Sequence, residues 1–324
     1  MIQKKLALLV LLTIFITGCD TFFGGGGGTI EVYDPYHGTQ GLAVTWLENM
    51  PPKEIYAGNQ FNIGVKVENM GAHDLTDAVL LLTHNPADAK VTNVRKNTNL
   101  TGKSSVQKYG ESDAIFWDAT AAAINEVRST SFGVMACYEY QTYMFEDICI
   151  DPDKYGQKMA EIKSCKSIDV ISLESQGAPV VVTMIKPTTV FDSKSDKSGI
   201  MQFDLTIQNV GGGDVGIVGP NTWCSAFLDT ITDNLDFNVV RISGTFMGQA
   251  ITCVPSLVYL DDGNEGNVVC QAKWQADKEF ETPLYINLGY TYKQVLEPVD
   301  VTIKIIPGSL SETQTTDAGK TLNN

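Results

Sequence analysis

Residues 63–74, with the sequence IGVKVENMGAHD, and residues 203–214, with the sequence FDLTIQNVGGGD, decide the fold of this chain. Both stretches alternate apolar and polar side chains, which is typical of a half-buried β-strand. Both then reach Asn-x-Gly, at Asn69 and at Asn209. Asparagine and glycine suit a strand end where the backbone leaves the ladder with a positive φ angle. The stretches align without a gap, so the chain contains an internal repeat.

A second pair of matching stretches lies later in each half. Residues 134–140 read VMACYEY and residues 286–292 read INLGYTY, so each ends in Tyr-x-Tyr. Each half therefore has an early strand that ends in Asn-x-Gly and a late strand that ends in Tyr-x-Tyr. Other segments also alternate with the period of a strand, while helical periodicity is weak. The sequence predicts an all-β protein that is built from two similar domains.

The opening of each half resembles a known family. The residues concerned are LAVTW at 42–46, IYAGNQF at 55–61 and VKVENMG at 65–71. They look like the start of a CARDB-type immunoglobulin-like module, and residues 180–211 are similar to a second, more diverged copy. The resemblance covers most of residues 42–307 and implies two tandem immunoglobulin-like antiparallel β-sandwiches, which recur in archaeal and bacterial surface proteins. It implies no enzymatic activity and supplies no site residues.

The N-terminus has the residue order of a secretory signal. Lys4 and Lys5 precede a short apolar run at residues 6–16, and a small residue stands directly before Cys19. The cysteine placement resembles the lipobox of archaeal and bacterial lipoproteins, which implies cleavage before Cys19 and a lipid on the new N-terminus. The alternatives are a plain secretory signal that is cut elsewhere and an uncleaved anchor, although a spanning helix needs about 20 apolar residues.

The domain organisation follows from these features. We expect a lipoprotein signal peptide at residues 1–18 and a lipidated, glycine-rich tether at residues 19–41. Unbroken glycine runs behave as flexible coil. Two immunoglobulin-like domains follow, at residues 42–175 and 176–307. The tail at residues 308–324 is rich in Ser, Thr, Asp and Asn, which predicts disorder.

The first domain is expected to carry an insertion at residues 143–165, between its Tyr-x-Tyr strand and an expected last strand at residues 168–173. Setting Cys19 aside leaves an even number of cysteines, which in an exported chain indicates disulfides. Cys149 and Cys165 lie near the ends of the insertion. Because the insertion must leave and rejoin the sandwich, these two cysteines are predicted to pair.

The remaining cysteines divide into one predicted pair and two open positions. Cys253 and Cys270 stand nearly symmetrically about a predicted hairpin turn, which places them on facing strands within disulfide reach. Cys137 and Cys224 lie one in each domain. They either pair and clamp the two domains together or stay as buried thiols. A bond between Cys137 and Cys149 across a turn is a further alternative.

Composition and motifs exclude several function classes. The formal net charge of −15 argues against nucleic acid and anionic lipid surfaces as partners, since both need basic patches. Residues 211–216 fit GxGxxG, but the residues after them cannot begin the helix that would hold a pyrophosphate. There is no GxSxG, HExxH or P-loop pattern, and there are three histidines. The sequence therefore predicts no catalytic residues, no cofactor and no metal.

Some residues have both a functional and a simpler structural interpretation. The acidic stretches at 151–153 and 261–265 offer oxygen ligands for calcium, but the second is also ordinary hairpin-turn chemistry. Asn99 begins an N-glycosylation sequon, which also arises by chance. The tryptophans are expected in the core, with a sugar-stacking platform as the alternative; they are Trp46, Trp117, Trp223 and Trp274.

The functional expectation follows from a tether, two β-domains, an acidic surface and disulfides, without catalytic chemistry. We expect a lipid-anchored protein at the extracytoplasmic face of the cell membrane, with a structural or interaction role in adhesion, spacing or assembly. Its partners would be the membrane, through the lipid, and another surface protein or a glycan. The alternative is an extracytoplasmic carbohydrate- or peptide-binding module that uses the insertion, because function tends to sit on long loops of a rigid scaffold.

Overall fold

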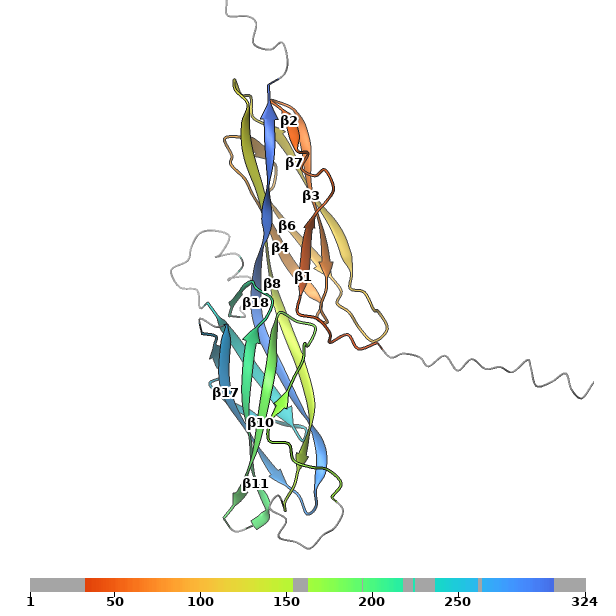
Figure 1. Ribbon diagram of the computed structural model, residues 1–324, viewed down its shortest axis with the longest axis vertical. Coiled ribbons are helices and arrows are strands. Elements are labelled where there is room, and N and C mark those ends of the chain that lie inside the picture. The colour runs from red at the N-terminus through yellow and green to blue at the C-terminus, as the bar shows by residue number, and fades with distance from the viewer. Residues whose placement is uncertain are drawn as a thin grey trace, which may run out of the picture. The chain divides into compact units, whose positions relative to one another are not determined.

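The computed structural model describes residues 33–153, 163–193, 195–217, 224, 237–261 and 264–305 (Figure 1). The chain divides into residues 1–33 and a second compact unit, residues 34–324, which contains all the strands. The predicted signal, Cys19, the glycine run and the tail therefore lie outside the described residues. None of the described residues form a helix of the length and apolarity that crossing a bilayer takes.

Every element that the structure describes is a β-strand, as the sequence predicted. The strands of the N-terminal half are β1 (Leu42–Trp46), β2 (Glu54–Tyr56), β3 (Gln60–Asn69), β4 (Leu75–Thr83), β5 (Ala89–Val91), β6 (Arg95–Leu100), β7 (Ser112–Ala121) and β8 (Arg128–Ile150). The strands of the C-terminal half are β9 (Ile171–Ser172), β10 (Val180–Asp192), β11 (Ser195–Asn209), β12 (Asp214–Gly216), β13 (Val239–Phe246), β14 (Gln249–Ala250), β15 (Thr252–Val254), β16 (Leu257–Tyr259), β17 (Glu265–Gln275) and β18 (Phe280–Lys304).

The first sandwich packs two sheets face to face. One sheet has the order β1-β3-β7-β5, and all its pairs are antiparallel. The facing sheet contains β6, β4, the first part of β8 and the last part of β18, with β2 paired in parallel to the end of β18. The rings of Phe61 on β3 and Phe132 on β8 meet edge to face, with centroids 5.7 Å apart. The apolar faces of the two sheets therefore form one core.

The second sandwich has the same two-layer construction. One sheet has the order β15-β17-β11-β10-β9. The facing sheet contains β14, β13, the first part of β18 and the last part of β8. The rings of Phe203 on β11 and Phe246 on β13 meet with centroids 5.0 Å apart. Trp274 on β17 is also buried in this core. The two halves of the chain thus form two tandem antiparallel β-sandwiches.

The long strands β8 and β18 belong to both sandwiches (Figure 1). They pair antiparallel from Phe280 opposite Ile150 to Ile303 opposite Arg128. β8 has 23 residues, which corresponds to a strand roughly 75 Å long. Its first part pairs with β4 in the first sandwich, while the first part of β18 pairs with β13 in the second. Each strand then continues into the other sandwich, so the two sandwiches exchange their last strands.

This exchange differs from the predicted domain boundaries. Residues 143–150, expected to begin an insertion, are instead the end of β8 and form a strand of the second sandwich. Residues 168–173, expected to close the first domain, contribute only the short β9, which pairs with β10. The first sandwich is closed by residues 299–304 of β18. Residues 154–162 of the expected insertion lie outside the described residues. The physical reason is that burial continues to alternate along β8 as far as Ile150.

Candidate functional site at the crossing of the two sandwiches

Four tyrosines meet where β8 and β18 pass from one sandwich to the other. Tyr138 and Tyr140 come from β8, and Tyr290 and Tyr292 come from β18. Each side chain is at most 1% exposed. Tyr138 is the cross-strand partner of Tyr292, and Tyr140 is the partner of Tyr290. The ring centroids of these two pairs are 5.8 Å and 6.0 Å apart. The two Tyr-x-Tyr sequences of the repeat therefore form one cluster, which we call the tyrosine crossing.

The tyrosines of β8 bind backbone groups of the N-terminal half and of the segment before β10. The Tyr138 hydroxyl accepts a hydrogen bond of 3.1 Å from the backbone N–H of Leu42 on β1. The Tyr140 hydroxyl donates to the carbonyl of Gly177 over 2.9 Å. It also accepts from the backbone N–H of His73 over 3.3 Å. These contacts fix the end of the first half to the chain that leads into the second.

The tyrosines of β18 bind the second half in a similar way. The Tyr290 hydroxyl lies 3.0 Å from Oγ1 of Thr142 and accepts from the backbone N–H of Val180 over 3.3 Å. The Tyr292 hydroxyl accepts from the backbone N–H of Gly213 over 2.6 Å and donates to Oδ1 of Asn209 over 3.3 Å. All four buried hydroxyls thus have partners, as a buried polar group requires.

The Asn-x-Gly sequences form two equivalent turns beside the tyrosine crossing. Oδ1 of Asn69 accepts from the N–H of Gly71 over 3.1 Å, and its Nδ2 donates to the His73 carbonyl over 2.8 Å. Oδ1 of Asn209 likewise accepts from the N–H two residues later, over 3.2 Å. The glycines of the two Asn-x-Gly sequences, Gly71 and Gly211, do not have the positive φ that the sequence predicted, although the next residue of the second turn, Gly212, has a φ of 76°. Gly71 is needed instead for close approach, because a Cβ atom there would collide with the Tyr140 hydroxyl.

Burial keeps the crossing neutral. It raises the pKa of Tyr140 and of Tyr292 to about 12. It raises the pKa of Tyr138 and of Tyr290 further still. The phenols are therefore protonated across the physiological range, so each can donate as well as accept. The neutral phenols of the tyrosine crossing offer no nucleophile or general base. Their hydrogen bonds instead connect the two sandwiches.

A disulfide lies directly beside the tyrosine crossing. Cys137 precedes Tyr138 on β8 and is bonded to Cys224, with a Cα–Cα distance of 5.6 Å. In sequence Cys224 stands between β12 and β13. The sequence left this pairing open, and the structure contains it. The bond attaches a segment of the second half to the strand that leaves the first.

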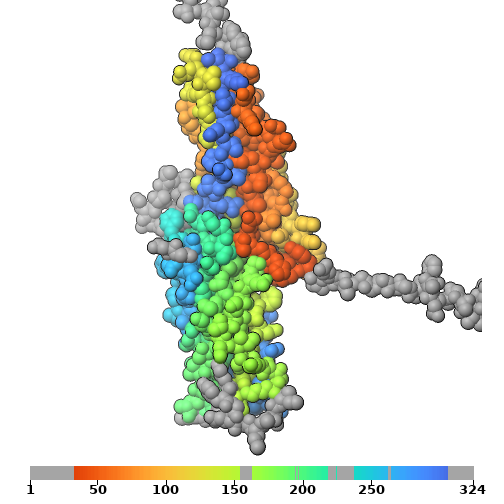
Figure 2. Space-filling view, viewed as in Figure 1, coloured from red at the N-terminus to blue at the C-terminus, as the bar shows by residue number. Residues whose placement is uncertain are grey.

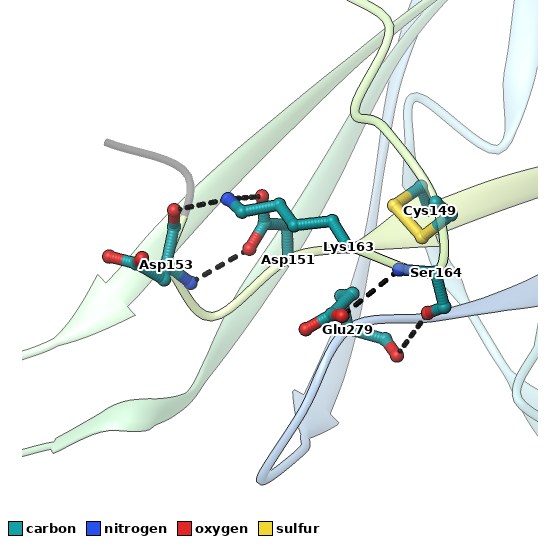
Figure 3. Close-up of a disulfide and its surroundings, with 7 residues drawn as sticks. Cys149, Asp151, Asp153, Lys163, Ser164 and Glu279 are labelled. Atoms are coloured by element: carbon teal, nitrogen blue, oxygen red, sulfur yellow. Dashed lines mark hydrogen bonds and ion pairs between the residues drawn. A yellow bond between two sulfur atoms is a disulfide. The ribbon is translucent and has the colours of Figure 1, made fainter. Parts of the chain in front are cut away.

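The predicted bond between Cys149 and Cys165 is also present, with a Cα–Cα distance of 5.8 Å. Figure 3 shows its surroundings. Ser164 donates from its backbone N–H to Oε1 of Glu279 over 3.0 Å, and its Oγ donates to the Glu279 carbonyl over 2.9 Å. The disulfide joins Cys165, at the end of the expected insertion, to β8, and the two hydrogen bonds hold the neighbouring Ser164 against Glu279, which directly precedes β18.

The first candidate calcium stretch lies in the same region. Nζ of Lys163 lies 2.6 Å from Oδ2 of the buried Asp151 and 2.6 Å from the carbonyl of Asp153 (Figure 3). The hydrogen bond to Asp151 raises the pKa of Lys163. An ammonium group thus already neutralises the carboxylate that the sequence offered as a metal ligand. Within the described ranges, no group of three or more His, Cys, Asp or Glu side chains is placed to hold a metal ion.

The third disulfide joins Cys253 and Cys270, which are direct cross-strand partners on β15 and β17. The second candidate calcium stretch forms a turn, in which the N–H of Asn264 donates to the Asp261 carbonyl over 2.8 Å. Asn264 has a φ angle of 58°, which is a turn conformation that asparagine tolerates. In the structure this stretch therefore serves as a turn that reverses the direction of the chain.

The glycosylation and tryptophan candidates are placed apart from the crossing. Asn99 is exposed on β6, and its Oδ1 accepts from the N–H of Asp77 over 2.7 Å. Trp117 and Trp274 are buried in the two cores. Trp46 on β1 is half-buried and donates from Nε1 to the carbonyl of Glu297 over 2.9 Å. Trp223 lies outside the described residues.

Comparisons of the chain with known proteins find matches among solved structures alone. No family model matches the chain. No curated protein matches it either. Among solved structures, the chain is similar to the C-terminal domain of the Streptococcus agalactiae AgI/II polypeptide BspA, with 10% identity, a TM-score of 0.18 and coverage of 82% of this chain and 99% of that chain. It is also similar to the CupB6 tip adhesin from Pseudomonas aeruginosa, with 7% identity, a TM-score of 0.15 and coverage of 83% and 95%. Likenesses this weak carry no argument about function.

Proposed function

We propose that the protein is a lipid-anchored, extracytoplasmic structural or interaction protein, which acts in adhesion, spacing or assembly at the cell surface. The observation that carries this proposal is the exchange of β8 and β18 between the sandwiches. Two domains on a linker can bend about it, but bending here would break a continuous ladder of hydrogen bonds. The tyrosine crossing and the disulfide at Cys137 support the same conclusion. Such a unit suits a protein that holds a partner in a fixed geometry.

The location follows from redox chemistry and from the N-terminal sequence. Three disulfides are typical of proteins that fold and work in an oxidising compartment. The residue order up to Cys19 adds a lipid anchor to this proposal. The resemblance to CARDB-type modules supports a surface role without catalysis. The alternative, a binding loop at residues 143–165, is less favoured because residues 143–150 are a paired strand.

The anchor is tested in cells that process lipoproteins. We expect the full chain to partition into detergent and to carry a lipid at Cys19, with the segment before it removed. Cys19→Ser should release the protein or leave the signal uncut. Cys253→Ala is the matched control, since it also removes one sulfur but should leave partitioning unchanged. An unmodified mature N-terminus at another residue, found by intact-mass spectrometry, would contradict the proposal.

A further inference from the structure

β18 pairs with β8 along one edge. Along its other edge it pairs with several shorter strands in turn, and one stretch of this edge has no paired strand among the described residues. β13 pairs with residues 284–289, and β12 pairs with residues 291–293. β2 then pairs with residues 302–304. Between these contacts, at residues 294–301, no strand of the described chain pairs with this edge. At about 3.3 Å per residue the interruption is roughly 26 Å long, which is the length of an ordinary strand. We call residues 294–301 the open edge.

A second free edge faces this one. Among the strands that the structure describes, β1 is the outermost of its sheet and pairs with β3 alone. A hollow of about 640 Å³ lies between them, lined by residues 42–45 of β1 and residues 293–297 of β18, with Gln40 and residues 211–214, which lead into β12, completing its wall. Figure 2 shows the C-terminal part of the described chain, in blue, running along the surface beside red and orange residues of the N-terminal half. An added strand could therefore lie along β18 with β1 on its other side.

Side chains already take positions at which a strand would bond. Nε2 of Gln294 donates to the carbonyl of Leu42 on β1 over 2.7 Å. Nε1 of Trp46 donates to the carbonyl of Glu297 on β18 over 2.9 Å. Each is a side-chain donor to a backbone acceptor of a free strand edge. In a sheet, carbonyls at such positions accept hydrogen bonds from the backbone N–H groups of a neighbouring strand, and an extended peptide offers the same donors.

The same edge has a pocket for a side chain. A second hollow, of about 560 Å³, continues along β18 past Trp46. Its apolar lining residues are Trp46, Leu47, Met50, Pro51 and Val299, and its rim also has the polar residues Asn49, Lys53, Glu54, Asp300 and Thr302. In strand addition, main-chain hydrogen bonds give affinity and pockets for alternate side chains give specificity. This pocket suits one bulky apolar side chain of the peptide.

We propose that the open edge binds an extended peptide of a partner protein, which adds as a strand between β12 and β2 and places one bulky apolar side chain against Trp46. The inference rests on the proposed interaction role and names the chemical class of the partner. The flanking strands support it, because a strand in the interruption would continue the sheet on both sides. Pro298, which has no N–H to offer, lies at a bulge of this edge, so the peptide would pair on either side of this position and not at it.

The test uses the mature chain expressed from residue 20 onward, so that it carries neither the predicted signal nor the lipidated cysteine. Peptides are selected against it from a displayed library of random extended sequences, and the most enriched one is synthesised. We expect its binding to protect the backbone amides of residues 42–46 and 294–301 from hydrogen exchange. Protection confined to other residues would overturn the proposal, and so would a library that gives no enriched peptide.

Matched variants locate the site. Val295 on the open edge and Val190 on β10 are 62% and 49% exposed. Val295→Lys should weaken peptide binding at least about tenfold, because a charged side chain on a strand edge opposes pairing. Val190→Lys should leave it unchanged. Trp46→Ala should weaken binding, whereas Trp46→Phe keeps an apolar wall, frees the Glu297 carbonyl and should bind at least as well as the native chain.

Two other results would overturn the proposal. An equal loss of peptide affinity in Val295→Lys and Val190→Lys would show that the peptide does not use the open edge. Dimers that protect residues 294–301 without any peptide would show that the occupant is a second copy of this chain. Because the assay uses lipid-free protein, failure of the anchor proposal leaves the peptide result interpretable. A melting curve for each variant separates lost binding from lost folding.

Discussion

Tyr138 on β8 and Tyr292 on β18 are direct cross-strand partners, and their hydroxyls are bound by backbone N–H groups of different halves of the chain. The donor to Tyr138 is Leu42 of the first sandwich, and the donor to Tyr292 is Gly213 of the second. The ring centroids are 5.8 Å apart. One aromatic contact therefore connects two hydrogen bonds that anchor separate parts of the sequence. We expect the stability of the two halves to be coupled through it.

Removing either hydroxyl should destabilise the whole unit. Tyr292→Phe keeps the ring but leaves the part-buried N–H of Gly213 without its acceptor. Such a loss costs about 1–3 kcal/mol of unfolding free energy. Tyr138→Phe should behave similarly, through the N–H of Leu42. Urea denaturation followed by fluorescence measures the change. The control is Tyr143→Phe, because Tyr143 is exposed and its hydroxyl binds only the Gln141 side chain in the described structure; a comparable loss there would contradict the argument.

Strand exchange predicts that the chain cannot be shortened from its C-terminus into β18. Deletion of residues 295–324 removes the strand that closes the first sandwich, including the buried Val301 and Ile303. We expect proteolysis of residues 42–121 to become rapid, although these lie far away in sequence. Deletion of residues 306–324 leaves β18 complete and is the control. If both shortened chains resist protease equally, the first sandwich does not depend on the exchanged strand.

Local sequence patterns predicted much of this architecture but not the exchange. Alternation identified the strands, and spacing gave the pairs Cys149–Cys165 and Cys253–Cys270, both of which the structure contains. Alternation reports which face of a strand is buried but not which strand it pairs with. A strand that serves two sandwiches therefore looks like two shorter strands. The Tyr-x-Tyr repeat was visible in the sequence, but its assembly into one cluster depends on that partner choice.

Two residues hid the continuity of the long strands. Thr142 is polar, which ends an apolar alternation, yet it is buried because its Oγ1 donates to the Val180 carbonyl over 2.6 Å. Pro298 is a residue that usually ends a strand. In the structure it lies at a bulge in the pairing of β18 with β8, and the ladder resumes at Val299. Both are tertiary effects that a single sequence does not reveal.

The disulfides should contribute unequally to stability. In the chain-entropy model the benefit grows with the loop that is closed. Cys137 and Cys224 are 87 residues apart, while Cys149 and Cys165 are 16 apart. The double alanine variants should therefore lose roughly 4.5 and 3 kcal/mol of unfolding free energy. Urea denaturation without reductant measures both.

The third disulfide supplies the control for this comparison. Cys253 and Cys270 are 17 residues apart, so their double alanine variant should match that of the other short loop. Equal losses for all three variants would show that loop length does not decide the contribution. A smaller loss for the variant at Cys137 would show that the tyrosine crossing holds the sandwiches together without the bond.

The buried phenols should make the protein labile at high pH. A tyrosine in the unfolded chain has a pKa of about 10, and burial raises the pKa of Tyr140 and of Tyr292 to about 12 in the folded state. Below pH 10 both states are protonated, and the stability from neutral burial is fully present. As the pH rises from about 10 to 12, the unfolded chain loses protons that the folded chain keeps. The unfolding free energy must therefore fall across this window.

The contribution of one phenol to the pH dependence of stability can be separated from that of the lysines, whose ordinary pKa of about 10.4 lies in the same pH range. Each phenol that is ionised only in the unfolded chain contributes a slope of about −1.4 kcal/mol per pH unit. Tyr140→Phe removes one such group, so its unfolding free energy should fall less steeply than that of the native chain between about pH 10 and 12. Urea denaturation at several pH values gives both slopes, and tyrosinate absorbance reports ionisation in the folded state. Parallel slopes, or a tyrosinate absorbance of the folded native chain near pH 10 that exceeds that of folded Tyr140→Phe by the absorbance of one phenol, would show that the phenol is not held neutral by burial.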